Sequence, residues 1–155
     1  PGASGDISLL DGQASNSHIV WYQDSAGPYH PTPLVYGDYY FTLLDRGFFT
    51  VHDARTGEEL YFTEQQIQTQ EVRSRIAPGA TGFTSSPWAY NGKIFFLDEN
   101  SVTHVLQAGR EFKLLHRNRL TEKEGICMAT PALVGDRLLI RTDVRIYCIR
   151  KGGAQ

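Results

Sequence analysis

The stretch YGDYYFTLLDRGFFTVHDARTGEELY, residues 36–61, decides the fold class of this chain. Aromatic and β-branched residues alternate in it with turn residues, which is typical of short strands joined by tight turns. We expect strands over 32–36, 39–43, 48–53 and 58–62, with turns at 37–38, 45–47 and 54–57. Four such strands in succession form an antiparallel meander.

The same pattern recurs twice further along the chain. Pro33, Pro87 and Pro131 are each followed by a Gly within four or five residues, then by an apolar strand, an Asp and another strand. The interval from Pro87 to Pro131 is 44 residues. It fits the roughly 40–50 residues of a four-stranded propeller blade. The interval from Pro33 to Pro87 is longer, 54 residues, and we attribute the excess to a polar loop over 65–82.

The sequence therefore predicts an all-β chain of β-propeller blades, each a four-stranded antiparallel meander. We expect about three blades plus a partial N-terminal blade, divided as follows: the third and fourth strands of a partial blade over 5–23, a blade over 29–66, a loop over 67–82, a blade over 83–120 and an incomplete last blade over 127–151. Blades need neighbours on both faces. We expect the chain to be the C-terminal portion of a larger propeller, whose remaining blades are its partners, or to close a ring by self-association.

Residues 51–61, VHDARTGEELY, resemble the blade-docking motif Ala-x-Asp-x-x-x-Gly-x-x-x-Trp of the PQQ-like (quinoprotein-like) β-propeller repeat family. Asp53 and Gly57 match the motif, Val51 replaces Ala and Tyr61 replaces Trp. The three Ser/Thr-Pro segments resemble the element that starts each blade in that family. The chain looks most like members of the non-dehydrogenase type. That resemblance implies a scaffold or binding module with an extracytoplasmic, periplasmic location.

The residues that carry this pattern also have plain structural roles. Asp53 is placed to cap the turn that follows it, and Gly57 to adopt a positive φ there. Trp21 and Tyr61 offer flat surfaces for contact between sheets. A proline at the start of a strand removes an N–H that is not needed in the ladder; Pro33, Pro87 and Pro131 hold that position.

No catalytic group of residues is recognisable. By resemblance, active quinoprotein dehydrogenases hold PQQ and Ca²⁺ on the propeller axis and often carry a disulfide between adjacent cysteines, but this chain has no Cys-Cys pair. Its five histidines lack metal-site spacing, and neither a nucleophile elbow nor a P-loop is present. We predict no catalytic residue, metal or cofactor. The alternative is a fragment of a PQQ- and Ca²⁺-dependent quinoprotein dehydrogenase.

Ligand contacts, if the chain makes them, are expected in the loops that lead into each blade, near the axial funnel. The residues there with polar, aromatic or thioether side chains are Tyr29, His30, Thr84, Ser85, Met128 and Thr130. The competing interpretation of the hydroxyl groups among them is that they serve the local turns and strands. Tyr29 and His30 stand out because they immediately precede a first strand.

Composition excludes some classes of function. The formal net charge is -2, and the cations at 110–123 are interrupted by Glu111, Glu122 and Glu124, so no nucleic-acid-binding stripe is present. No apolar run approaches the roughly 18 residues of a membrane helix. The first residues, PGASGD, contain no signal-peptide core, and we expect a processed chain or a piece of a longer one. Cys127 and Cys148 are predicted to be buried small hydrophobes, with a disulfide left open.

Overall fold

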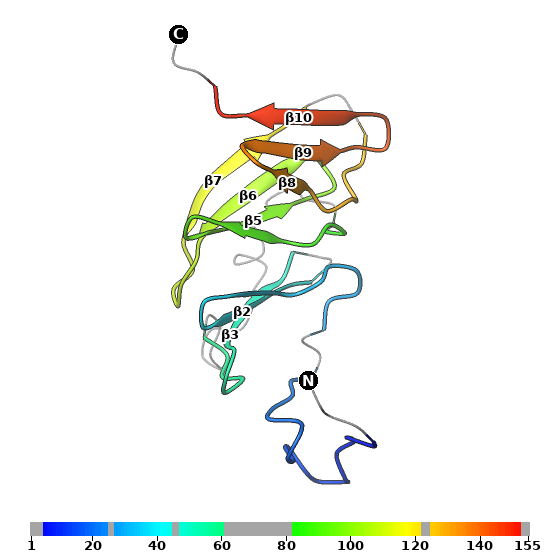
Figure 1. Cartoon of the computed structure of the whole chain (residues 1–155), viewed down its shortest axis with the longest axis vertical. Coiled ribbons are helices and arrows are strands. Elements are labelled where there is room, and N and C mark those ends of the chain that lie inside the picture. The colour runs from blue at the N-terminus through cyan, green and yellow to red at the C-terminus, as the bar shows by residue number, and fades with distance from the viewer. Residues whose placement is uncertain (1–4, 25–26, 45–46, 61–81, 122–124, 153–155) are drawn as a thin grey trace.

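The computed structural model describes residues 5–24, 27–44, 47–60, 82–121 and 125–152. These residues form three antiparallel sheets of three, four and three strands, and they contain no helix. The sheets lie one above another in chain order along the long axis of the molecule (Figure 1). The all-β fold class, with meander sheets as propeller blades, is thereby confirmed. No helix in these ranges is long and apolar enough to cross a membrane.

The first sheet consists of β1 (Leu34–Tyr36), β2 (Tyr39–Leu43) and β3 (Phe49–Asp53). The fourth strand expected over 58–62 is reduced, in the described part, to one bridge between His52 and Glu59. Two backbone hydrogen bonds, Asp53 N–H to Glu58 O and Leu60 N–H to Val51 O, hold it there. Residues 61 and 62, the loop over 67–81, and the proposed docking residue Tyr61 lie outside the described residues.

The second sheet has the full set of four strands: β4 (Trp88–Tyr90), β5 (Lys93–Leu97), β6 (Val102–Gln107) and β7 (Leu114–Arg119). The third has β8 (Ala132–Val134), β9 (Arg137–Arg141) and β10 (Ile146–Arg150). In both sheets each strand pairs with the next one in the chain. The second sheet is therefore the complete blade with which the other two can be compared.

The first hairpin of every sheet has a turn of two residues, but the turns are of two kinds. Its closing pairs are Tyr36 with Tyr39, Tyr90 with Lys93 and Val134 with Arg137. In the second sheet Asn91 and Gly92 have φ of 48° and 70°, as a type I′ turn requires at both central positions. In the other two sheets the glycine takes the first central position. This difference in turn explains why the Gly lies five residues after Pro87 but four after the other two prolines.

Two apolar clusters join the sheets. The first cluster brings Phe41, Leu43, Phe49 and Val51 of the first sheet together with Phe83 and with Ile94, Phe96 and Leu106 of the second. The rings of Phe49 and Phe96 meet edge to face, with centroids 4.7 Å apart. The second cluster joins Leu97, Cys127 and Ile140, with Trp88 and Leu138 against it. Burial of these side chains provides the main attraction between neighbouring blades.

The N-terminal segment differs from its prediction. Residues 5–24 contain no strand, whereas we expected a third and a fourth strand of a partial blade over 5–23. The side chain of Asn16 closes this segment instead: its amide donates to the carbonyls of Ile7 and Ser8, and its oxygen accepts from the N–H groups of His18 and Ile19. Outer strands need an inner neighbour for their backbone hydrogen bonds, and the described residues supply none there.

Trp21 nevertheless docks on the first sheet. Its indole N–H donates to the carbonyl of Ala54 at 3.2 Å, and its ring lies against Gly57. A Cβ on Gly57 would come within 2.6 Å of the ring, and φ at Gly57 is +75°. The position therefore requires glycine for two independent reasons, the backbone conformation and the close approach of Trp21.

The prediction for the cysteines was right for one residue and wrong for the other. Cys127 is fully buried, but Cys148 is exposed, and both are free thiols. Cys148 lies on β10 opposite Leu139, on the face of the third sheet that has no neighbour among the described residues. A pattern of apolar residues in a strand indicates which positions share a face, but not whether another sheet covers that face.

Gly57→Ala should destabilise the chain more than Gly37→Ala. Both positions have positive φ, but a Cβ on Gly37 meets nothing within 4 Å, whereas on Gly57 it strikes Trp21. We expect the free energy of unfolding to fall by about 1–3 kcal/mol more for Gly57→Ala, the usual range for overpacking. Thermal unfolding followed by Trp fluorescence measures the difference. Equal losses for the two variants would contradict the contact with Trp21.

Candidate functional site at the inner rim of the blades

Three residues that each precede a proline link the blades through hydrogen bonds. The N–H of Thr32 donates to Oγ of Ser86, and the N–H of Ser86 donates to Oγ1 of Thr130, both at 2.9 Å. The partners are 54 and 44 residues apart, which are the two intervals of the sequence repeat. Equivalent positions of successive blades are thus bonded directly to one another. We name residues 29–33, 84–87 and 128–131, which lead into β1, β4 and β8, the inner rim.

The hydroxyl groups of the inner rim are occupied by the fold. Oγ of Ser85, in a residue only 1% exposed, donates to the carbonyl of Leu97 at 2.8 Å. Oγ1 of Thr84 donates to a carboxylate oxygen of Glu99, 15 residues along the chain. Oγ1 of Thr130 accepts from Ser86, as described above. Three of the six residues predicted to contact a ligand therefore hold backbone or neighbouring side chains in place.

The other three predicted residues are exposed on the same rim. Tyr29 is 82% exposed and Met128 is 53% exposed. The ring of Tyr29 meets that of His30 edge to face, with centroids 4.3 Å apart. The hydrogen bonds through Ser86 bring the segments that carry these residues to one end of the blades.

A hollow of about 170 Å³ lies elsewhere, on the first sheet. Trp21, Gln23, Gly27, Tyr40 and His52 line it, and the rings of Trp21 and His52 are nearly parallel, 6.4 Å apart. Nδ1 of His52 is buried without a hydrogen-bond partner, and burial lowers the pKa of His52. None of the sequence patterns described above predicted this hollow. The sequence feature that corresponds to this hollow is the alternation of side chains along β2 and β3. It places Tyr40 and His52, which are paired across the two strands, on one face of the sheet.

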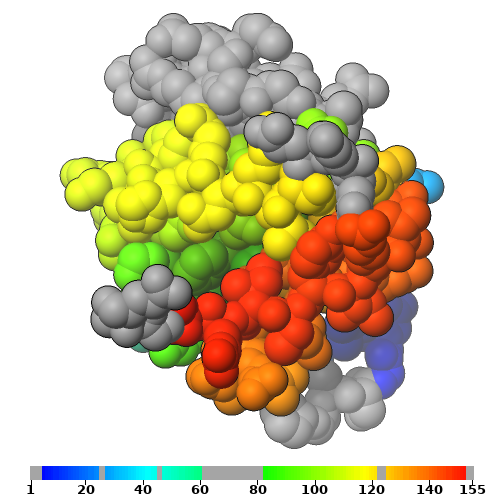
Figure 2. All heavy atoms as spheres, turned by 90° about the horizontal axis from the view of Figure 1, so that it is seen from above, coloured from blue at the N-terminus to red at the C-terminus, as the bar shows by residue number. Residues whose placement is uncertain are grey.

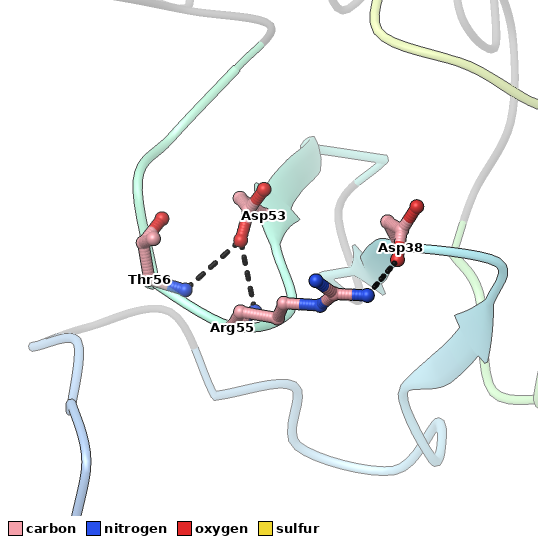
Figure 3. Close-up of polar contacts among 4 residues, drawn as sticks. All are labelled: Asp38, Asp53, Arg55 and Thr56. Atoms are coloured by element: carbon pink, nitrogen blue, oxygen red, sulfur yellow. Dashed lines mark hydrogen bonds and ion pairs between the residues drawn. The ribbon is translucent and has the colours of Figure 1, made fainter.

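The neighbouring charged residues Asp53 and Arg55 are part of the scaffold. Oδ1 of Asp53 accepts the N–H groups of Arg55 and Thr56, both at 2.9 Å, and the guanidinium of Arg55 reaches Asp38 at 3.1 Å (Figure 3). The amides of Thr56 and Arg55 lower the pKa of Asp53. Asp53 therefore caps a turn in its charged form. The exposed ion pair between Arg55 and Asp38 contributes little to stability.

Asp98 and Cys127, two further buried titratable residues, have hydrogen-bond partners within the fold. His104 and Asp98, both buried, form a hydrogen bond of 2.8 Å, and Oδ1 of Asp98 accepts the N–H of Val102. Burial raises the pKa of the Cys127 thiol, whose sulfur lies 3.2 Å from Oγ of Ser101. A protonated, buried thiol is a poor nucleophile. In the described ranges, no three His, Cys, Asp or Glu side chains come together as a metal site would require.

Comparisons with known proteins bear on the fold alone. No family model and no curated protein matches the chain. The solved structure of BamB from Moraxella catarrhalis matches with a TM-score of 0.52 and 18% identity over 79% of this chain and 33% of that chain. The computationally designed Ika4 protein matches with a TM-score of 0.51 and 12% identity over 77% of this chain and 64% of that chain. This chain thus spans a third of the BamB chain, and the likeness supports the propeller fold.

Ser86→Ala should weaken the link between the blades, whereas Ser86→Thr should preserve it. Removal of the hydroxyl leaves the N–H of Thr32 without its acceptor, at a cost of about 1 kcal/mol in the free energy of unfolding. Threonine keeps the acceptor in the same place. Chemical denaturation of the three proteins measures the effect. If Ser86→Thr loses as much stability as Ser86→Ala, the hydroxyl is not the cause.

Acid should destabilise the chain through His52. Burial lowers its folded pKa below the ordinary 6.5, so the unfolded chain takes up the proton first and stability falls as the pH drops below about 6.5. The slope from one such group is at most about 1.4 kcal/mol per pH unit. His52→Leu, which installs the residue type of the equivalent Leu106, should flatten this part of the profile. His18→Leu, an exposed position, should not, and an unchanged slope in His52→Leu would refute the assignment.

Proposed function

We propose that the chain is a non-enzymatic β-propeller scaffold that binds a protein partner through its inner rim. The observation that carries the proposal is that some rim residues form hydrogen bonds within the fold whereas others are exposed. Thr84, Ser85 and Thr130 are used within the fold, which leaves the large exposed side chains of Tyr29 and Met128 for contact. Tyrosine and methionine are both enriched in protein interfaces, because they combine a large contact area with adaptability.

The same proposal places the three sheets in a larger array of blades. Propeller sheets are stabilised by neighbours on both faces, and the first and third sheets each have one face without a neighbouring sheet among the described residues. The further blades belong to a longer propeller or to other copies of the chain. By resemblance to the PQQ-like repeat family, we propose an extracytoplasmic location, which fractionation of cells that express the full protein would test.

Partner binding should depend on Tyr29 and Met128. We expect the Tyr29→Ala/Met128→Ala double variant to lose the proteins retained from a host extract by the immobilised wild-type chain. Tyr90→Ala is the matched control, because Tyr90 is 66% exposed but closes the β4–β5 hairpin, at the other end of that strand from the rim. Retention of the same proteins by the double variant would contradict the proposed binding surface.

Addition of PQQ and Ca²⁺ to the chain separates this proposal from a quinoprotein dehydrogenase fragment. A ligand that binds the folded state raises the unfolding temperature, and the size of the shift reports its affinity. We expect no shift and no quinone absorbance retained after desalting. A clear shift would contradict the non-enzymatic proposal.

A further inference from the structure

Successive blades of the chain meet through opposite faces. The face of the first sheet that carries Phe41 and Val51 packs on the face of the second that carries Ile94 and Leu106. The other face of the second sheet, with Trp88 and Leu97, meets Leu138 and Ile140 of the third. Each sheet thus has two different faces. We call the face turned toward the preceding blade the backward face, and the face turned toward the next blade the forward face.

The forward face of the third sheet is open. Cross-strand pairing places Val134, Arg137 and Arg150 in one row of that face, with Arg141 and Ile146 in another. Val134 is 59% exposed and Ile146 is 74% exposed. Figure 2, which looks down on this end of the molecule, shows the third sheet (orange to red) largely uncovered. Arg137 and Arg150 are direct cross-strand neighbours, an arrangement of like charges that is unfavourable by itself, and an exposed ion pair of 3.7 Å between Arg137 and Asp136 offsets part of it.

The backward face of the first sheet is open at its inner end. A row across this face runs from Val35 through Tyr40 and His52 to Glu59. Trp21 stacks on His52 at the outer end, while Val35 on the innermost strand is 60% exposed. The equivalent row of the second sheet is buried in the first apolar cluster. Glu59 is half-buried, and burial raises the pKa of its carboxyl group, so a cation would be favourable beside it.

The two outermost residues of the hydrogen-bonded set Thr32, Ser86 and Thr130 each have, within the described structure, one unused polar group, and these two groups are complementary. Ser86 accepts through its hydroxyl and donates through its N–H, whereas Thr32 only donates and Thr130 only accepts. Among the described residues, no acceptor is assigned to the N–H of Thr130 and no donor to the hydroxyl of Thr32, and both residues are exposed. Thr130 therefore has a free N–H donor at one end of the rim, and Thr32 has a free hydroxyl acceptor at the other end. An N–H donating to a hydroxyl oxygen is the same kind of hydrogen bond that joins the blades within the chain.

We propose that the open forward face of the third sheet docks on the open backward face of the first sheet of a second copy of this chain. In this contact the N–H of Thr130 donates to the hydroxyl of Thr32 in the second copy. The apolar residues Val134 and Ile146 cover Val35, and the arginines of the third sheet face the side that carries Glu59. The contact continues the two blade interfaces within the chain and rests on the proposed array of blades.

The geometry of this contact is head-to-tail. A contact between two different faces leaves one open face on each end of any linear assembly, so association continues until the copies close a ring or grow into an open filament. The segment around Trp21 lies at the outer end of the first sheet's backward face and leaves Val35 exposed at the inner end.

Sedimentation velocity of the purified 155-residue chain over a wide range of concentration tests this proposal. We expect the wild type to associate with increasing concentration. Thr32→Val, which removes only the hydroxyl and no assigned hydrogen bond within the chain, should weaken association about fivefold, as the loss of one hydrogen bond predicts. Thr32→Ser should associate like the wild type.

Ile146→Lys tests the docking face itself. It adds a cation to an arginine-rich face at a side chain that is already 74% exposed, so it should abolish association without unfolding the chain. Leu10→Lys, at a side chain 72% exposed on the N-terminal segment, is the control that should still associate. A wild type that stays monomeric, or association that is insensitive to either Thr32→Val or Ile146→Lys, would overturn the proposal. Partner binding through Tyr29 and Met128 is measured in the separate retention experiment, so either proposal can be contradicted without the other.

Discussion

Ser86 connects three blades through a single residue. It accepts a hydrogen bond from Thr32 and donates one to Thr130, so the start of each inner strand is held at a set distance from the next. A proline follows each of the three residues, and the strand begins directly after it in every sheet. With the inner strands placed in this way, the faces of neighbouring sheets meet in register and the apolar clusters close between them.

Most of the local structure could be predicted because it depends on near neighbours in the sequence. Strands over 39–43 and 93–97 follow from their apolar and aromatic residues, and the Asn91-Gly92 turn from the φ values that these two residues tolerate. The repeat interval also anticipated which segments lie side by side. The sequence could not show that the hydroxyl groups before the prolines make the contacts, since a Ser/Thr-Pro pair serves equally well as an isolated turn.

The errors concern residues whose environment is set by another blade. Residues 5–23 have the composition of outer strands, but the described part of the chain supplies no inner strand to pair with them. Cys148 is apolar in character, and it is exposed because no sheet among the described residues covers its face. His52 is buried although the alternation around it shows only which face it shares with Tyr40, because Trp21 stacks on it from more than thirty residues away. Local pattern identifies faces, and only the assembly of blades determines which faces are covered.

Amide hydrogen exchange at Thr32, Ser86 and Thr130 tests whether these hydrogen bonds join the blades in solution. All three residues precede a proline at the start of a strand, so Thr130 serves as an internal reference for the other two. The N–H groups of Thr32 and Ser86 should be strongly protected, and that of Thr130 should exchange rapidly in dilute solution. Exchange at Thr32 and Ser86 as fast as at Thr130 would contradict the inter-blade hydrogen bonds on which this description of the fold depends.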